Sequence, residues 1–207
     1  MLEALTGTGL AASAGLNAYI PLLTMGLLAR YTDAIDLPTG WDWLSNGWIL
    51  FILAVLLAIE MVADKVPVVD HLNDVVQTVV RPTAGGLAFG AGSSSQTVTV
   101  DDPGSFFGSH QWVPIAAGVI IALVVHGVKS ASRPVVNATT AGFGAPVAST
   151  AEDLSSVVMS VLAILLPVLV LVGLLLLGWA AVWVVRRRRR RRADWPLSGS
   201  GTRRRFG

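Results

Sequence analysis

The sequence contains no cysteine, and this absence removes several classes of chemistry. Without thiols the chain can form no disulfide, no thiolate nucleophile and no cysteine-ligated metal site. Histidine is also scarce, since the 207 residues include only His71, His110 and His126. These three are scattered and form no HExxH or HxH pattern, so we expect neither a transition-metal site nor a cofactor.

Charge is the second scarce property. Only 14% of the residues are charged, whereas 53% are hydrophobic, and this balance is too apolar for an ordinary soluble domain. All but five of the 15 basic residues lie from Arg186 onward, so the body of the chain is acidic. We expect the seven arginines from Arg186 to Arg192 to contact anionic lipid headgroups on the cytoplasmic side of a bilayer, and not nucleic acid.

Long apolar runs are the dominant feature that remains. A membrane-spanning helix needs about 20 mostly apolar residues. Four runs are long enough: 1–30, 47–66, 112–128 and part of 154–185. Two more, 75–91 and 134–150, are short and rich in glycine and proline, and they either cross as broken helices or re-enter. The sequence therefore predicts an all-α, polytopic helical membrane bundle with about six spans, four full and two short broken or re-entrant.

The division of the chain follows from the same pattern. We expect residues 1–185 to form a single integral membrane domain and residues 186–207 a disordered basic tail. Residues 1–30 have Glu3 ahead of their apolar part instead of basic residues, so we expect them to stay as the first span. Asn17 and Pro21 lie on that span. They predict either a packing face with a kink or a polar site to which Asn17 contributes its side-chain amide.

The distribution of basic residues predicts the orientation, because lysine and arginine favour the cytoplasmic side. With six crossings, Lys65, Lys129 and Arg133 fall inside, and Arg30 is the one basic residue out of place. The acidic loops fall outside, including 92–111 and the loop with Glu152 and Asp153. If both short segments re-enter, Lys129 and Arg133 move outside. We therefore expect a multi-pass protein of the cell membrane with both termini in the cytoplasm.

Ionisable residues interrupt the apolar runs between Glu60 and Gly86, and charges at membrane depth are functional by default. Glu60 and Asp64 are four residues apart and share a helix face. A second set recurs every three or four residues on the following helix: Asp70, Asp74, Gln77 and Arg81. The alternative interpretation is that residues 64–74 form a solvated turn outside the bilayer.

Three of the ionisable residues are expected at similar depth. Glu60 follows Trp48 by about the same distance as His126 follows Trp112, and Arg81 climbs back to a comparable level. Acidic, basic and small residues at one depth are typical of transporter binding sites. The alternative is a structural ion pair between Glu60 and Arg81, with His126 as a hydrogen-bonded core histidine.

We therefore favour a small transporter or channel for an ion, a proton or a small charged solute. Glu60 would carry the proton or cation, Arg81 would be its counter-charge and His126 a proton-exchanging group. The candidate pathway consists of the polar side chains in or beside the spans: Asn17, Glu60, Asp64, Lys65, Asp70, His71, Asp74, Arg81, His126, Lys129, Arg133 and Asn137.

Two other functions remain open at this point. The charges could instead hold together a non-transporting scaffold or lipid-binding protein, and either protein could form a homo-oligomer. An enzyme is not expected, because the sequence shows no GxSxG, no HExxH and no paired GxGD-type aspartates.

Two motifs carry a resemblance to a known family. The stretch ADKVPVVDHLNDVVQTVVRPTAGG, Ala63–Gly86, together with GLNAYIPLL, Gly15–Leu23, resembles a bacterial multi-pass membrane family known as a domain of unknown function, DUF4126. The likeness extends from Ala4 to about Val185. It implies a membrane topology and nothing about a substrate.

Overall fold

The computed structural model describes residues 2–38, 40–65, 67–93, 112–140 and 144–170, together with 172, 173, 175 and 179. The chain divides into two compact units, Met1–Leu171 and Val172–Gly207. In the second unit the four described residues are helical. The expected boundaries at 185 and 186 stay a prediction, because they fall outside the described residues.

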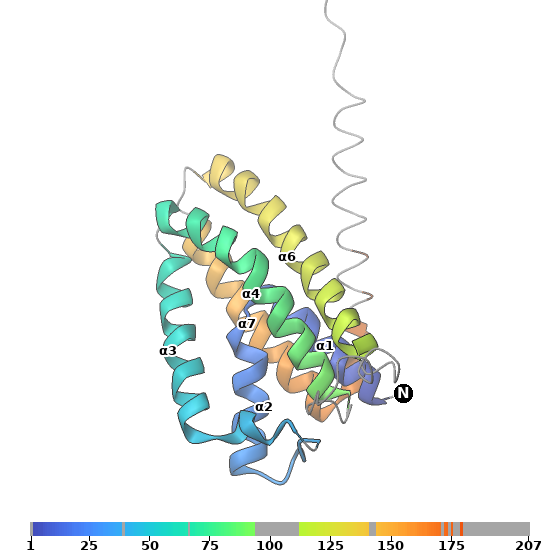
Figure 1. Ribbon diagram of the computed structural model, residues 1–207. Coiled ribbons are helices and arrows are strands. Elements are labelled where there is room, and N and C mark those ends of the chain that lie inside the picture. The colour runs from blue at the N-terminus through green and yellow to red at the C-terminus, as the bar shows by residue number, and fades with distance from the viewer. Residues whose placement is uncertain are drawn as a thin grey trace, which may run out of the picture. The chain divides into compact units, whose positions relative to one another are not determined.

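Every secondary-structure element among the described residues of the first unit is a helix, and no strand occurs there (Figure 1). The helices are α1 (Leu2–Leu16), α2 (Tyr19–Tyr31), the 3-10 helix η1 (Asp42–Ser45), α3 (Gly47–Ala63), α4 (Pro67–Gly92), α6 (Trp112–Thr140) and α7 (Gly144–Leu165). The predicted all-α class is confirmed for this part of the chain.

Local sequence explains where several of these helices begin and end. The side-chain oxygen of Asn46 accepts a hydrogen bond of 2.9 Å from the backbone N–H of Trp48, which caps the start of α3. Helix α7 ends at Leu165, two residues before Pro167, because the residue that precedes a proline is disfavoured in the helical conformation. Helix α7 therefore begins at Gly144, ahead of residue 154, where the sequence had placed the start of the last apolar run.

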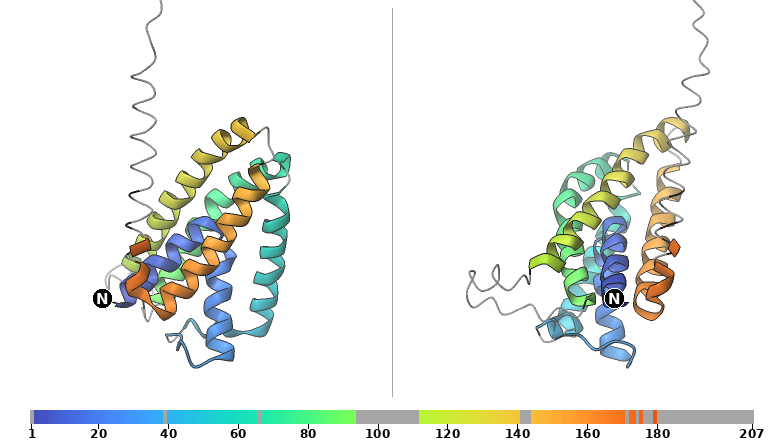
Figure 2. Two further views of the ribbon diagram at one scale, coloured as in Figure 1. Left: turned by 180° about the vertical axis from the view of Figure 1, so that it is seen from behind. Right: turned by 90° about the vertical axis from the view of Figure 1, so that its right-hand side faces the viewer.

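Two helical hairpins, α3 with α4 and α6 with α7, run in the same sense and make up most of the first unit. In Figures 1 and 2, the end of α3 and the start of α4 lie at one end of the unit, together with the end of α6 and the start of α7. We call this the turn end. The start of α1, η1, the end of α4 and the start of α6 lie at the opposite end, which we call the loop end.

Helices α1 and α2 do not form the single span that residues 1–30 predicted. Helix α1 starts at the loop end, where Gly7 lies against Phe89, and reaches the interior at Gly15, which lies against Ala122. Helix α2 then returns to the loop end, where Gly26 lies against Leu44. The pair is a re-entrant hairpin whose tip lies inside the unit.

Asn17 explains why residues 1–30 form two helices instead of one span. Its side-chain oxygen accepts hydrogen bonds from the backbone N–H groups of Tyr19, at 3.1 Å, and Ile20, at 3.3 Å. Asparagine competes with the helical backbone in this way and favours helix starts over helix interiors. A new helix therefore begins after Asn17, and the chain changes direction there.

Of the two segments that the sequence predicted to be broken, 75–91 lies in one continuous helix and 134–150 does not. Segment 75–91 belongs to the 26-residue helix α4, which continues through Pro82. Segment 134–150 is divided between the end of the 29-residue helix α6 and the start of α7. The glycines of α4 permit close packing instead of a break, because Gly85 lies in direct contact with Gly118 of α6.

The surface of the unit is rich in large apolar side chains. Two of the described helical stretches, Trp112–Arg133 and Gly144–Leu165, are long and apolar enough to cross a membrane, and Gly47–Ala63 is a shorter apolar helix. Only 22% and 28% of the residues in the two longer stretches are buried, unlike the core helices of soluble proteins. The helices suggest a membrane protein, but six spans are not confirmed.

Candidate functional site

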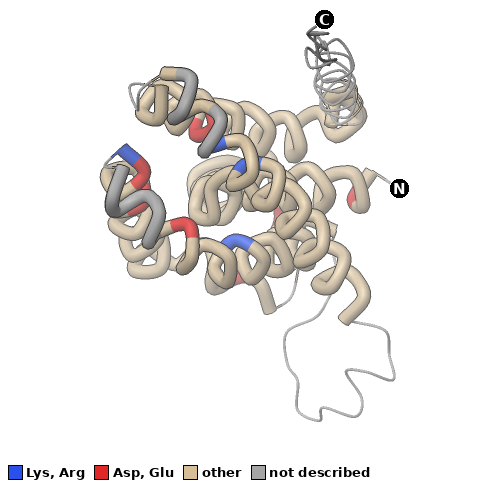
Figure 3. Tube along the Cα trace, turned by 90° about the horizontal axis from the view of Figure 1, so that it is seen from above, with Lys and Arg blue, Asp and Glu red and all other residues tan. Residues whose placement is uncertain are grey.

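Charged side chains of α3, α4 and α6 meet in the interior of the first unit, and Figure 3 shows basic and acidic positions interspersed over neighbouring helices. Glu60 and Arg81 are 1% and 0% exposed. Nη2 of Arg81 lies 2.8 Å from Oε1 of Glu60 and 3.8 Å from Oδ2 of Asp64. The ion pair expected between Glu60 and Arg81 is therefore present.

Asp64 is the centre of this network. It lies at the end of α3, where a solvated turn was the alternative interpretation, yet it is only 1% exposed. Its Oδ2 lies 3.4 Å from Nζ of Lys129 and 3.2 Å from Nη2 of Arg133, and its Oδ1 accepts a 2.8 Å hydrogen bond from Asn73. The solvated interpretation is wrong for Asp64 because two cations and an amide replace water around its carboxylate.

Glu152 of α7 completes the network from the opposite side. Its Oε2 lies 2.9 Å from Nζ of Lys129 and 3.0 Å from Nη2 of Arg133. Glu152 and Asp153 were expected in an outside loop, and this prediction was wrong because both lie inside a continuous helix. One signal could have placed them correctly: the polar residues Ser149, Asp153, Ser156 and Ser160 recur every three or four positions, which indicates one helix face.

The tip of the re-entrant hairpin bonds directly to the charged network. Nζ of Lys129 donates to the carbonyl oxygen of Leu16 at 2.9 Å, and Nη1 of Arg81 donates to that of Gly15 at 3.5 Å. These carbonyls end α1, where the helix has no further N–H groups for them and where positive charge is stabilising. Sequence patterns could not reveal these contacts, because every residue carries a backbone carbonyl and no residue type marks the ones that accept these bonds.

Asn17 and a serine cluster join the hairpin to α7. Nδ2 of Asn17 donates to Oδ1 of Asp153 at 2.9 Å. Ser13 and Ser156 each donate a hydroxyl to the other's backbone carbonyl, at 2.8 and 3.1 Å, and the hydroxyl of Ser160 lies 2.6 Å from that of Ser13. The side-chain amide of Asn17 therefore bonds to a polar site, as one of the two alternatives from the sequence predicted, and this site lies on α7.

His126 of α6 contacts two residues of α4, Arg81 and Thr78. Its Nδ1 lies 3.2 Å from Nη1 of Arg81, and its Nε2 lies 3.3 Å from Oγ1 of Thr78. Because arginine carries only donors, Nδ1 must accept this bond, which leaves the ring proton on Nε2. The hydroxyl of Thr78 donates to the carbonyl of Asp74 and is therefore free to accept the Nε2–H bond.

The other predicted site residues are placed differently. Lys65 is exposed, and its Nζ donates to the carbonyl of Met61 at 2.9 Å, outside the buried network. Asp74 is half-buried and its Oδ1 has no hydrogen-bond partner among the described residues. Asp70 and His71 lie in α4 and Asn137 in α6, but their side chains fall outside the described part of the structure.

Several buried oxygens of the site have no hydrogen-bond partner within the described residues. They are Oε2 of Glu60, Oε1 of Gln77, Oγ of Ser149 and Oδ2 of Asp153. A buried acceptor without a donor destabilises the folded state by about 1–3 kcal/mol. Taken over the described residues, no group of three histidine, aspartate or glutamate side chains is arranged to hold a metal ion. The interior therefore combines fixed ion pairs with acceptors that could receive a proton or another donor.

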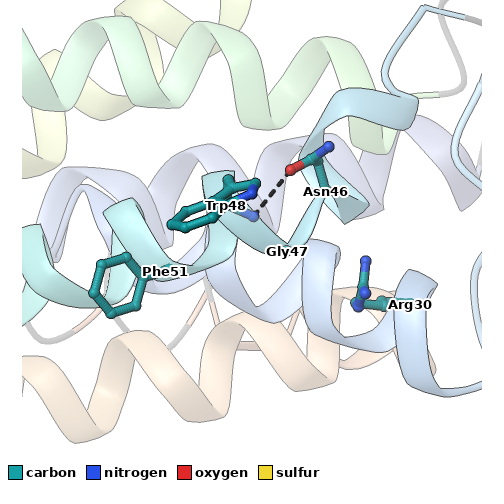
Figure 4. A pocket seen from close by; sticks show the side chains of 5 residues that line it. All are labelled: Arg30, Asn46, Gly47, Trp48 and Phe51. Atoms are coloured by element: carbon teal, nitrogen blue, oxygen red, sulfur yellow. Dashed lines mark hydrogen bonds between the residues drawn. The ribbon is translucent and has the colours of Figure 1, made fainter.

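A separate surface cavity of about 520 Å³ lies at the loop end (Figure 4). It is lined by Arg30, Asn46, Gly47, Trp48 and Phe51. Nη1 of Arg30 donates to the carbonyl of Ser45 at 2.8 Å, which ties α2 to η1. This cavity includes none of the predicted pathway residues.

Comparison with known proteins identifies one family. The family model described as "Domain of unknown function (DUF4126)" matches residues 4–187. No curated protein and no solved structure matches the chain. The match covers the re-entrant hairpin, both helical hairpins and every residue of the buried network.

Proposed function

This chain belongs to the DUF4126 family, and we propose that it is a multi-pass membrane transporter or channel for an ion, a proton or a small charged solute. The observation that carries the proposal is the interrupted helix at the buried charges, where Lys129 and Arg81 bind backbone carbonyls of α1 as well as carboxylates. Many transporters build their sites from half-helices whose ends meet charged groups near the membrane midplane.

The distribution of side chains on α6 supports a position within the bilayer. Ile120 and Val124 are 61% and 62% exposed, whereas His126, Lys129 and Arg133 on the same helix are buried. An apolar exterior around a charged interior is the reverse of a soluble protein and is stable when the exterior contacts lipid. The proposed location is the cell membrane.

The orientation that we propose differs from the sequence prediction at one terminus. Lys129 and Arg133 are held in buried ion pairs, so Lys65 at the turn end and Arg30 at the loop end are the exposed basic residues of the described helices. We keep the orientation that the sequence predicts for Lys65, with the turn end in the cytoplasm and Arg30 as the basic residue out of place. The start of α1 lies at the loop end and is therefore outside, which revises the expectation that both termini are cytoplasmic. The tail lies outside the described residues, and its cytoplasmic position stays a prediction.

Accessibility of introduced cysteines tests this topology, because the natural chain has none. We expect Ala4→Cys and Ala34→Cys to react with an impermeant maleimide added to intact cells, since both exposed positions lie at the loop end. Lys65→Cys at the turn end should react only after the membrane is permeabilised. Labelling of Ala34→Cys without labelling of Ala4→Cys would contradict the re-entrant hairpin.

A flux assay in proteoliposomes tests transport itself. We expect purified protein to move protons or small ions across the vesicle membrane, and we expect the double variant Glu60→Gln/Arg81→Gln to be folded but inactive. Val124→Leu, on the apolar exterior of the same unit, is the matched control and should retain flux. Equal flux in protein-free vesicles and in vesicles with the natural chain would contradict the proposal.

One observation favours the second candidate, a non-transporting scaffold or lipid-binding protein. Arg81, Lys129 and Arg133 are all engaged in ion pairs, as in a structure that charges hold together. The proposed partners under either function are bilayer lipids, with anionic headgroups at 186–192, a segment outside the described residues. We propose no enzymatic activity, no cofactor and no nucleic-acid partner, and a homo-oligomer is compatible with both functions.

A further inference from the structure

We propose that Asp153 is a proton-binding residue of the buried site, which makes the proton an ion that this protein carries. The inference rests on the proposed transport function and gives it a named ion and a named carrier. It differs from the sequence expectation, in which Glu60 carried the proton.

Asp153 differs from the other buried carboxylates in its partners. Glu60, Asp64 and Glu152 each form an ion pair with arginine or lysine. Asp153 is 7% exposed and forms no ion pair with a described lysine or arginine. Its Oδ1 accepts a hydrogen bond from the neutral amide of Asn17 instead. No described lysine or arginine is therefore paired directly with this carboxyl group in place of a proton.

The second oxygen of Asp153 supplies the place for the proton. Oδ2 of Asp153 and Oγ of Ser149 are both buried and have no partner among the described residues. No described group donates to Oδ2, and a proton on that oxygen removes the charge of a carboxylate that is buried without an ion-pair partner.

A proton fits this site better than a metal cation. Hard metal ions take about six or more oxygen ligands, and within the described residues no three acidic or histidine side chains gather to supply them. Three charged groups of other elements act electrostatically on Asp153 without contacting it: Lys129 of α6, and Asp64 and Lys65 at the end of α3. These groups have both signs, so the local field does not exclude either protonation state.

Protonation at Asp153 also acts on the hairpin tip. A hydrogen bond to an ionised carboxylate is roughly twice as strong as one to a neutral carboxyl group. Binding of the proton therefore weakens the bond between Asn17 and Asp153, which holds the junction of α1 and α2 against α7. The junction is thereby held more loosely when the proton is bound, which links proton binding to movement of the re-entrant hairpin.

Infrared spectroscopy of the full chain in detergent tests the inference without any need for transport. The protonated carboxylic acids of the chain give carbonyl bands during a pH titration, and we expect one of these bands to be absent in Asp153→Asn. This variant keeps the shape of the side chain and an oxygen that can accept the bond from Asn17, so it should fold. Glu152→Gln, the adjacent acid paired with two cations, should retain the band. A band that persists in Asp153→Asn, or the lack of any titrating band, would overturn the proposal.

Two further arms separate the outcomes. We expect the titration midpoint to be the same in sodium and choline chloride; a sodium-dependent shift would identify a metal cation as the ligand and overturn the proton assignment. A band that depends on Asp153 in a protein without flux supports the proton site while transport fails. Flux in a protein whose band does not depend on Asp153 refutes the proton site while transport stands.

Discussion

Replacement of either Glu60 or Arg81 alone by glutamine is expected to lower the free energy of unfolding by about 3–5 kcal/mol. Each change leaves a charge buried without its main partner, because the two side chains are almost fully enclosed and lie 2.8 Å apart. Arg81→Gln should have the larger effect, since Arg81 also contacts Asp64, His126 and the carbonyl of Gly15. Thermal unfolding in detergent measures both changes.

The double variant Glu60→Gln/Arg81→Gln should recover part of this loss. It removes both charges from the interior and leaves two amides that can bond to each other, so the two single effects should not add. Additive losses would show that the two residues are not energetically coupled. If the double variant is stable but does not transport, the pair serves transport and not only the stability of the bundle.

Replacement of Gly118 by leucine is expected to destabilise the protein by about 1–3 kcal/mol or more, because overpacking a close contact forces the backbone apart. A Cβ atom at Gly118 would lie in direct contact with the carbonyl oxygen of Gly85 and 2.5 Å from Cβ of Phe89. Backbone atoms cannot move away as a flexible side chain would, so α4 and α6 must separate.

Gly127→Leu is the matched control, since it makes the same substitution on the same helix where nothing lies within 4 Å of the new Cβ. It should cause no loss and gains helix propensity over glycine. Gly118 is also two turns before His126, and Gly85 is one turn after Arg81, so separation of α4 and α6 should disturb the contact between those two side chains. Equal melting temperatures for the two variants would contradict the close approach of the helices.

The sequence was informative wherever the signal is local along the chain. Composition and apolar runs predicted an all-helical protein with an apolar exterior, and three- and four-residue spacing put Asp74, Gln77 and Arg81 on one face of α4. The similar spacing of Glu60 and His126 from the tryptophans before them, and the position of Arg81 after the turn, predicted one depth for all three. The structure places Arg81 in contact with both of the others.

Local signals misled where packing overrides them. Pro82 and the glycines near it predicted a broken helix, yet α4 runs through Pro82 and packs closely against α6 at Gly85. The real interruption lies at Asn17, where the sequence suggested a kink and the structure turns the chain back on itself.

The sequence by itself determined that this chain is helical, apolar outside and equipped with a few charges that need partners. Only the tertiary structure decided which partners they have. Lys129 meets Asp64 across 65 positions and Asn17 meets Asp153 across 136, and no spacing rule connects residues so far apart. Lys129 also binds the carbonyl of Leu16, an acceptor that every residue type carries. Its role is set by the place where α1 ends, which the folded backbone alone defines.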